Sequence, residues 1–305
     1  MVDLLSKARE YANIELLARQ MVEGFITGLH KSPYHGFSVE FAEHRLYNEG
    51  ESTRHIDWKV FAKTDRLYTK RYEEETNLRC QILLDNSPTM YFPKNDKNLE
   101  NGKIRFSILA AACLSYMLQR QRDAVGITTF GDDIEWQSPI KSTPKHIHNL
   151  FLQLHKMLEQ TPPQKHSAIA HVIHLMADKI HRRSLVVIFS DMLERKQDLE
   201  DVFSALKHLK HNHHEVLIFN VQDKQKEYDF LYENRLYEFV DVETNEKIIL
   251  NPSTIRTEYQ NQETQRMYQL KLKSGQFKID FVEVDIVKGI DQVLLPYLIK
   301  RASMK

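Results

Sequence analysis

Between residues 80 and 221 the chain alternates short apolar segments with amphipathic ones. The apolar segments are rich in β-branched and aromatic residues and cover 80–84, 125–130, 185–189 and 216–221. Between them, apolar residues recur at helical spacing within 106–118, 145–160, 167–182 and 197–211. Continuously apolar strands are typical of a sheet that is covered on both faces. The alternation therefore predicts an α/β fold, a mainly parallel, Rossmann-like sheet with helices on both faces.

The flanking segments predict smaller elements around this core. Residues 4–29 have helical spacing, and residues 33–76 show short alternating patterns with dense charge, which predict strands and turns. Residues 236–250 predict a hairpin, 252–273 a long polar helix, and 277–284 another strand. The closing helix contains Pro296, so it is either kinked there or begins later than its apolar pattern.

These patterns divide the chain into two parts. Residues 1–76 hold the N-terminal helix and a strand-rich elaboration that we expect to pack on the core. Residues 77–305 hold the α/β domain and a C-terminal extension.

Charge and glycine content exclude two classes of function. Lys+Arg and Asp+Glu number 42 each, so the formal net charge is zero, which argues against nucleic-acid binding. Only 9 of the 305 residues are glycine, and Gly102-Lys103 has no upstream glycine that would complete a phosphate-binding loop. We therefore do not expect this chain to bind a nucleotide.

The cysteine count and the apolar runs bear on the compartment. Cys80 and Cys113 are too few for a disulfide framework and suit a reducing environment. The N-terminus does not have the pattern of a signal peptide, and no apolar run is long enough to span a bilayer. These features predict a cytoplasmic protein without membrane insertion.

Acidic residues follow two of the predicted strands, where ligands bind in open α/β sheets. Asp85 comes after the strand at 80–84 and opens the sequence Asp85-Asn-Ser87-Pro-Thr89, and Asp191 follows the strand at 185–189. One carboxylate and two hydroxyls at alternate positions suit Mg²⁺, a hard ion that prefers oxygen ligands. The same residues are also typical of a helix cap or a turn, and spacing alone leaves both interpretations open.

Two regions of the sequence together carry a family resemblance. The first contains Arg45, the block Arg54-His-Ile-Asp57-Trp58, and Tyr72-Glu73-Glu-Glu75. The second is made of 84–90, 120–126 and Ser190-Asp191. Both resemble the bacterial domain-of-unknown-function family number fifty-eight, whose core is similar to a von Willebrand factor A domain.

The resemblance implies a metal-ion-dependent adhesion site that holds Mg²⁺ or Mn²⁺, in isolation or only with a partner bound. Its ligands would come from Asp85, Ser87, Thr89, Ser167 and Asp191. Thr89 replaces a serine of the family pattern and Ser167 a threonine, and both replacements keep a hydroxyl oxygen. The residues that would bind a partner or mark the family are Arg45, Arg54, Asp57, Trp58, Tyr72, Glu73 and Glu75.

The resemblance also implies a partner, a MoxR-type AAA+ ATPase together with its client protein. The chain would then be a non-enzymatic adaptor or chaperone-like protein that binds through its metal site. One alternative is a magnesium-dependent hydrolase in which Asp85 or Asp191 activates water, with Asp132 or Asp133 as a further base. A second alternative is that the metal site is empty and the residues around Trp58 alone carry the interaction.

Overall fold

The computed structural model describes residues 14–30, 44–46, 68–70, 78–93, 102–159, 168–193, 199–242 and 244–303. The chain divides into one compact unit of residues 1–26 and 78–305 and a smaller unit of residues 27–77. In the smaller unit, β1 (His44–Leu46) pairs antiparallel with β2 (Tyr68–Lys70). The helix α2 (Ile14–His30) begins in the larger unit and ends in the smaller one.

The larger unit is built on a six-stranded sheet with the order β10-β7-β6-β3-β4-β5. Its parallel strands are β3 (Arg79–Asp85), β4 (Ala124–Phe130), β6 (Leu185–Ser190), β7 (Glu215–Gln222) and β10 (Asp280–Asp285). The edge strand β5 (Ile134–Gln137) runs antiparallel to β4. Every residue of β6 is buried, as the continuous apolar pattern predicts. The prediction of a mixed α/β fold with a mostly parallel sheet is therefore confirmed.

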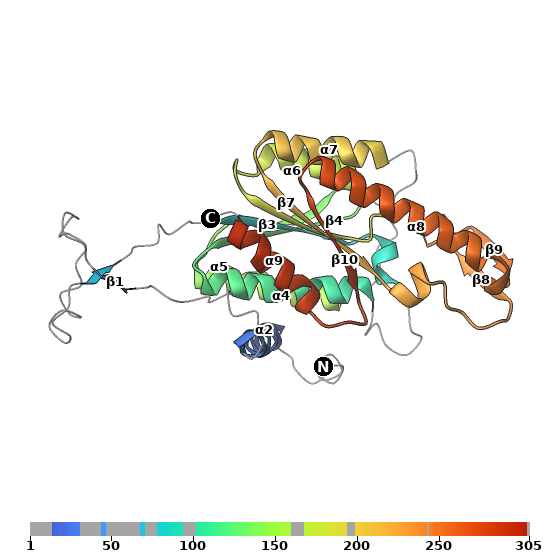
Figure 1. Cartoon of the computed structure of the whole chain (residues 1–305), viewed down its shortest axis with the longest axis horizontal. Helices are drawn as coiled ribbons and strands as arrows, with labels where there is room; N and C mark the ends of the chain where they lie inside the picture. The colour runs from blue at the N-terminus through green and yellow to red at the C-terminus, as the bar shows by residue number, and fades with distance from the viewer. Residues whose placement is uncertain are drawn as a thin grey trace. The chain divides into compact units, whose positions relative to one another are not determined.

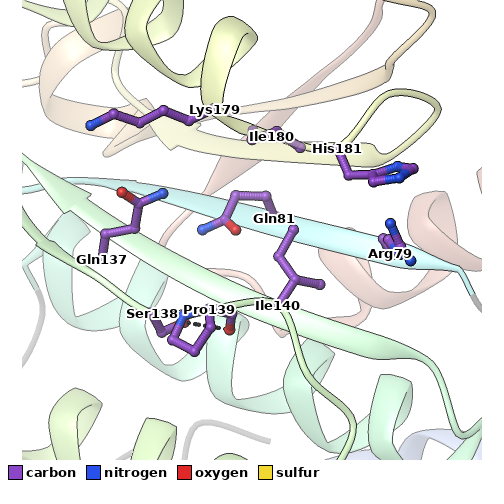
Figure 2. Close-up of a pocket in the computed structure, with 9 residues that line it drawn as sticks. All are labelled: Arg79, Gln81, Gln137, Ser138, Pro139, Ile140, Lys179, Ile180 and His181. Carbon is purple, nitrogen blue, oxygen red and sulfur yellow. Dashed lines mark hydrogen bonds between the residues drawn. The ribbon is translucent and has the colours of Figure 1, made fainter.

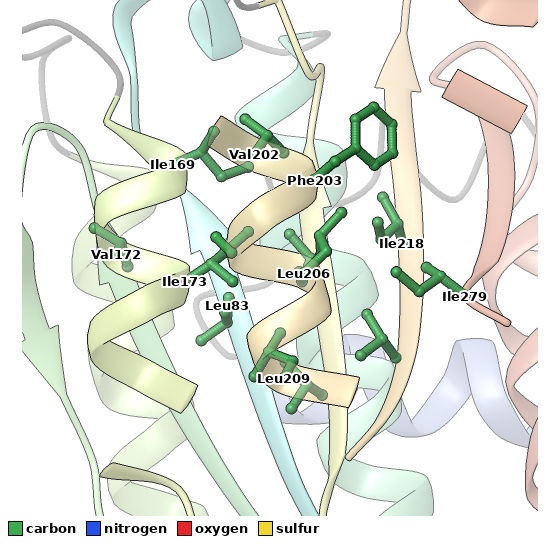
Figure 3. Close-up of a cluster of buried hydrophobic side chains, with 14 of the residues drawn as sticks. Leu83, Ile169, Val172, Ile173, Val202, Phe203, Leu206, Leu209, Ile218 and Ile279 are labelled. Carbon is green, nitrogen blue, oxygen red and sulfur yellow. The ribbon is translucent and has the colours of Figure 1, made fainter. Parts of the chain in front are cut away.

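Three helices cover one face of this sheet. They are α6 (Ile169–Lys179), α7 (Leu199–His211) and α8 (Pro252–Gln276). Their apolar side chains, among them Val172, Leu206 and Leu270, form one buried cluster with Leu83 and Ile218 of the strands. Figure 3 shows α6 and α7 packed over the strands, with Val172, Leu206 and Leu83 among the side chains between the two layers.

The opposite face is covered by α4 (Lys103–Arg120), α5 (Pro144–Leu158) and α9 (Asp291–Ser303), as Figure 1 shows. The α4 helix is buried along nearly its whole length. Its two buried serines, Ser107 and Ser115, each donate their hydroxyl to the carbonyl four residues earlier. These two hydroxyls are thus satisfied within the helix.

The predicted hairpin is confirmed, and two other elements, β10 and β5, differ from the sequence pattern. The strands β8 (Tyr237–Val240) and β9 (Lys247–Leu250) pair antiparallel and form a separate small sheet. The β10 strand begins only at Asp280, because Phe277 ends α8 and Lys278 has a left-handed backbone (φ 54°). The closing helix begins at Asp291 and contains Pro296. The edge strand β5 was not predicted, because its four residues are only half-buried and carry little apolar signal.

Candidate functional site

The strand order reverses at the centre of the sheet. From β3 the chain crosses to β4 on one side, and β6 later pairs with the other side of β3. Beyond the carboxyl ends of strands at such a reversal lies the crevice in which open α/β sheets bind ligands. Asp85 is the last residue of β3, and Asp191 follows the last residue of β6. The two carboxylates that the sequence singles out therefore meet at this crevice.

Asp85 is held by hydrogen bonds from two residues, Ser190 and Ser87. Its Oδ2 accepts the hydroxyl of Ser190 at 2.7 Å, and its Oδ1 accepts the backbone N–H of Ser87 at 2.9 Å. The side chain of Asp85 is 1 % exposed. A buried carboxylate needs such donors, because burial without them costs several kcal/mol.

Asp191 completes the group together with the two hydroxyls of the 85–89 loop. The hydroxyls of Ser87 and Thr89 lie 3.1 Å apart, and the Thr89 side chain is among the groups that lower the pKa of Asp191. The Oδ1 of Asp191 accepts the backbone N–H of Leu193 at 3.2 Å. Ser87 is the residue that precedes the short 3-10 helix η2 (Pro88–Tyr91), and Thr89 lies within this helix.

A fully buried lysine lies beside these carboxylates. Lys103 is the first residue of α4, and its Nζ donates to Asp191 Oδ2 at 2.7 Å. The same ammonium pairs with Glu227, which belongs to the π-helical turn η4 (Lys224–Tyr228). Glu227 in turn accepts the backbone N–H of Asp223 at 2.7 Å. Lys103 therefore joins the start of α4, the end of β6 and the η4 turn.

These contacts shift the pKa values of the carboxyl groups in opposite directions. Burial and the charge of Asp191 raise the pKa of Asp85 to about 7, although its bonds with Ser190 and Ser87 oppose the rise. Burial would also raise the pKa of Asp191, but the charge and hydrogen bond of Lys103 outweigh burial and lower it. Burial raises the pKa of Glu227. Asp85 is thus the carboxyl group whose charge is least compensated.

The donor set fits a hard divalent cation. Two carboxylates and two hydroxyls offer oxygen ligands of the kind that Mg²⁺ and Mn²⁺ prefer. When ionised, Asp85, Asp191 and Glu227 face the single ammonium of Lys103, while the nearby Arg266 is paired with Glu263. The negative charge in excess equals the charge of a divalent ion. No group of three or more His, Cys, Asp or Glu side chains suited to a metal occurs in the described part of the chain, so the hydroxyls are essential to this set.

The structure brings together four of the five predicted metal ligands, Asp85, Ser87, Thr89 and Asp191. The fifth, Ser167, lies outside the described residues, although the adjacent Ala168 donates its N–H to Gly131 O beyond the end of β4. Arg45 lies on β1, opposite Thr69. The other predicted partner-binding residues lie outside the described residues and are Arg54, Asp57, Trp58, Tyr72, Glu73 and Glu75.

Sequence reasoning missed Lys103, Ser190 and Glu227 as members of the site. One signal was present for Lys103: it opens a strongly apolar helix that has no acidic residue in its first turn. A cation there is disfavoured by the helix dipole and therefore needs a partner elsewhere. Ser190 directly precedes Asp191, whereas Glu227 is 124 residues from Lys103 and only the fold brings the two together.

A second hollow lies near the opposite, amino edge of the sheet. It has a volume of about 310 Å³ and is lined by Arg79, Gln81, Gln137, Lys179 and His181, among others. Figure 2 shows the side chains of Gln81 and Gln137 inside it, with Arg79 and His181 at one end. This hollow contains none of the residues that the sequence predicts for a site.

Comparison with known proteins gives relatives of undescribed function. Uncharacterized proteins of Mycobacterium bovis and Mycobacterium tuberculosis are 24% identical over 185 residues, which is 59% of this chain and 55% of theirs. The match thus spans about half the length of these relatives. None of the helices among the described residues combines the length and apolar character needed to cross a bilayer.

Two solved structures are similar to this chain. The conserved hypothetical protein BatB from Bacteroides thetaiotaomicron has a TM-score of 0.42 at 15% identity, over 75% of this chain and 100% of its own. An aerotolerance-related membrane protein from Bacteroides fragilis has a TM-score of 0.42 at 15% identity, over 73% of this chain and 97% of its own. A family model described as protein of unknown function DUF58 matches residues 43–269, which is well over half of the chain. The chain therefore belongs to the DUF58 family.

Proposed function

We propose that this protein is a non-enzymatic adaptor that binds a partner through a divalent metal ion at the carboxyl edge of its sheet. The observation that carries the proposal is the meeting of Asp85, Ser87, Thr89 and Asp191 around one point, with more carboxylate than cationic charge. A core of the von Willebrand factor A type, with its metal-ion-dependent adhesion site, is the finer form of the same proposal.

Within this proposal, the residues of the site have separate tasks. Ser87 and Thr89 supply neutral oxygens, and Asp85 and Asp191 supply charge. Bound Mg²⁺ or Mn²⁺ would supply an electropositive centre that a Glu or Asp of the partner can ligate. Lys103 offsets one of the carboxylate charges, so the protein supplies no more negative charge than the ion carries. A partner carboxylate would then supply a further ligand oxygen.

The partner proposed is a MoxR-type AAA+ ATPase acting on a client protein. This part of the proposal depends on the family resemblance, and the absence of a phosphate-binding loop from this sequence agrees with an ATPase on a separate chain. Chelation cannot test the interaction, because the ATPase needs Mg²⁺ for its own nucleotide. Binding of such an ATPase should instead be compared between wild type and Ser87→Ala, which removes one ligand oxygen and leaves the ATPase unchanged.

The metal site itself is tested by thermal unfolding with increasing Mg²⁺ or Mn²⁺. We expect a saturable rise in melting temperature for the wild type, since an ion at about 100 times its dissociation constant stabilises the native state by about 2.7 kcal/mol. Asp85→Ala should abolish the rise. Asp133→Ala is the matched control: this acid follows β4 at the same edge, but its Oδ1 accepts only the N–H of Ile134 at 2.7 Å. An equal response in wild type and Asp85→Ala would refute a metal at this site.

A magnesium-dependent hydrolase remains the second candidate, because a carboxyl group with a pKa of about 7 suits a general base. Turnover of phosphoester substrates with Mg²⁺ by wild type, lost in Asp85→Asn, would favour the hydrolase over the adaptor.

A further inference from the structure

The hairpin of β8 and β9 exposes an unusual concentration of apolar side chains. Figure 1 shows it beside the start of α8, away from the six-stranded sheet. Among the described residues, half of the exposed large apolar side chains fall between residues 231 and 255, and the most exposed within that segment are Leu236 at 72 %, Ile249 at 67 % and Ile248 at 58 %. Exposed apolar groups gathered in this way mark an interaction surface.

The hairpin is nevertheless firmly attached on one side. The Phe230 ring stacks on Tyr259 of α8 with centroids 4.4 Å apart and on Phe239 of β8 at 5.7 Å. Tyr232 meets Phe239 edge to face at 5.4 Å. These aromatic contacts fix the face of the hairpin that carries Phe239. The exposed residues therefore belong to an ordered element.

One edge of this small sheet is open. Asp241 donates its N–H to Glu246 O at 2.9 Å, so the main-chain carbonyl of Glu246 points toward the β8 side of the hairpin. The main-chain N–H and C=O groups of successive residues point to opposite edges of a strand. Those of Ile248 and Leu250 therefore point toward β8, and those of Lys247 and Ile249 point away from it. No strand among the described residues pairs with that outer edge of β9.

The exposure of Ile248 indicates that a neighbouring strand is missing at the outer edge of β9. Ile248 lies opposite Phe239, on the same side of the hairpin as the aromatic cluster, and is still more than half exposed. An apolar residue on the packed face stays exposed in this way when the next strand is missing. A strand added along β9 would cover it.

We propose that the missing strand is β9 of a second copy of this chain, paired antiparallel about a two-fold axis at Ile248. Two residues directly opposite each other in antiparallel strands either both point their main-chain N–H and C=O groups toward the other strand or both point them away. A two-fold axis between two copies of β9 must therefore lie where one residue is opposite the same residue of the second copy. With Ile248 opposite Ile248 of the second copy, Lys247 faces Ile249 and Glu246 faces Leu250. No like charges meet, and Phe239 and Ile248 of both copies form one continuous apolar row.

Two observations favour this pairing over other arrangements. A register centred on Ile249 would need Asn251 as a strand residue, but Asn251 caps α8 and Pro252 begins that helix. An anionic membrane is disfavoured as the partner, because acidic residues outnumber basic ones between residues 231 and 250. The pairing is independent of the metal site and does not rest on the proposed function.

The test is the mass of the full chain in solution by sedimentation velocity over a wide concentration range. We expect wild type to reach twice 36.1 kDa. Ile249→Pro removes an N–H that points away from β8, so the hairpin should persist while the protein stays at 36.1 kDa. Ile249→Thr, which keeps that N–H, is the matched control and should still form the dimer. A wild type of 36.1 kDa at every concentration, or a dimer in Ile249→Pro, would overturn the pairing.

A cross-link tests the register and does not depend on the proline variant. Ile248→Cys places two thiols directly opposite each other, within the distance that a disulfide spans, and should yield a covalent dimer on oxidation. Cys80 and Cys113 are buried and leave the background low. Ile249→Cys, offset across the two-fold axis and on the other face, should cross-link far less. Equal or faster cross-linking through position 249 would refute the proposed register.

Discussion

The carboxyl edge and the amino edge of the same sheet differ in how their buried charges are compensated. At the carboxyl edge, Asp191 and Glu227 share the single ammonium of Lys103, and the pKa of Asp85 is raised to about 7. At the amino edge, the buried Asp123 pairs with Arg301 and accepts the N–H of Leu78 at 3.2 Å. A full set of partners stabilises a fold, whereas a local excess of one charge reserves a place for a ligand.

The exposed charges of the amino edge support the same contrast. Arg79 and Lys179 line the hollow of Figure 2, and neither forms an ion pair with any residue that the structure describes. Both side chains are exposed, so water solvates their charges at little cost. Exposed charge at this edge therefore needs no ligand, whereas the buried charge of the carboxyl edge is where we propose one.

Lys103→Met should have the largest effect on stability. It removes the cation shared by two buried carboxylates, and breaking a buried pair in this way costs about 3–5 kcal/mol. Chemical denaturation without divalent ions measures this loss. If Mg²⁺ binds beside Asp191, the same variant should gain more stability from Mg²⁺ than wild type, because a competing positive charge is gone. A loss below about 1 kcal/mol would mean that Lys103 is solvated like a surface lysine.

The core of this fold could be predicted from the sequence because its signal is local. Runs such as 185–189 are apolar at every position, which only a doubly covered strand explains. The edge strand β5 and the start of β10 could not be predicted, because they depend on half-buried residues and on a left-handed turn at Lys278. Packing partners decide such elements, and no single window of sequence contains them.

The same distinction between local and long-range sequence signals holds within the candidate site. Asp85, Ser87 and Thr89 lie in one loop, so their spacing alone suggested that their oxygens converge. Glu227 reaches the site only because η4 follows β7 and places its carboxylate against the start of α4. The grouping of these oxygens was therefore predictable, whereas the balance of charge around them required the structure.

Asp85 should give the next largest effect, and it depends on pH. Its pKa rises from an ordinary value of 3.8 to about 7 in the native state, so between these values the unfolded state loses a proton that the native state keeps. Stability should therefore fall as pH rises from about 4 to about 7, by a few kcal/mol at most. Asp85→Asn removes this dependence, and its melting temperature relative to wild type should increase over that range. Parallel pH profiles of the two proteins would show that Asp85 is ionised throughout.

Arg79→Ala should have the smallest effect. It distinguishes a metal ion that is bound by local ligands from one that responds to the net charge of the whole protein. Arg79 and Asp85 are the two ends of β3, and a strand of this length spans about 20 Å. That distance is well beyond the screening length of about 8 Å at physiological salt, so removing Arg79 should leave the Mg²⁺ titration unchanged and alter stability by less than about 0.5 kcal/mol. Ser87→Ala, at the other end of the strand, should weaken the same titration. A change in Mg²⁺ affinity of similar size in both variants would mean that the ion responds to the net charge of the protein, and the contrast between the two edges would then carry no functional meaning.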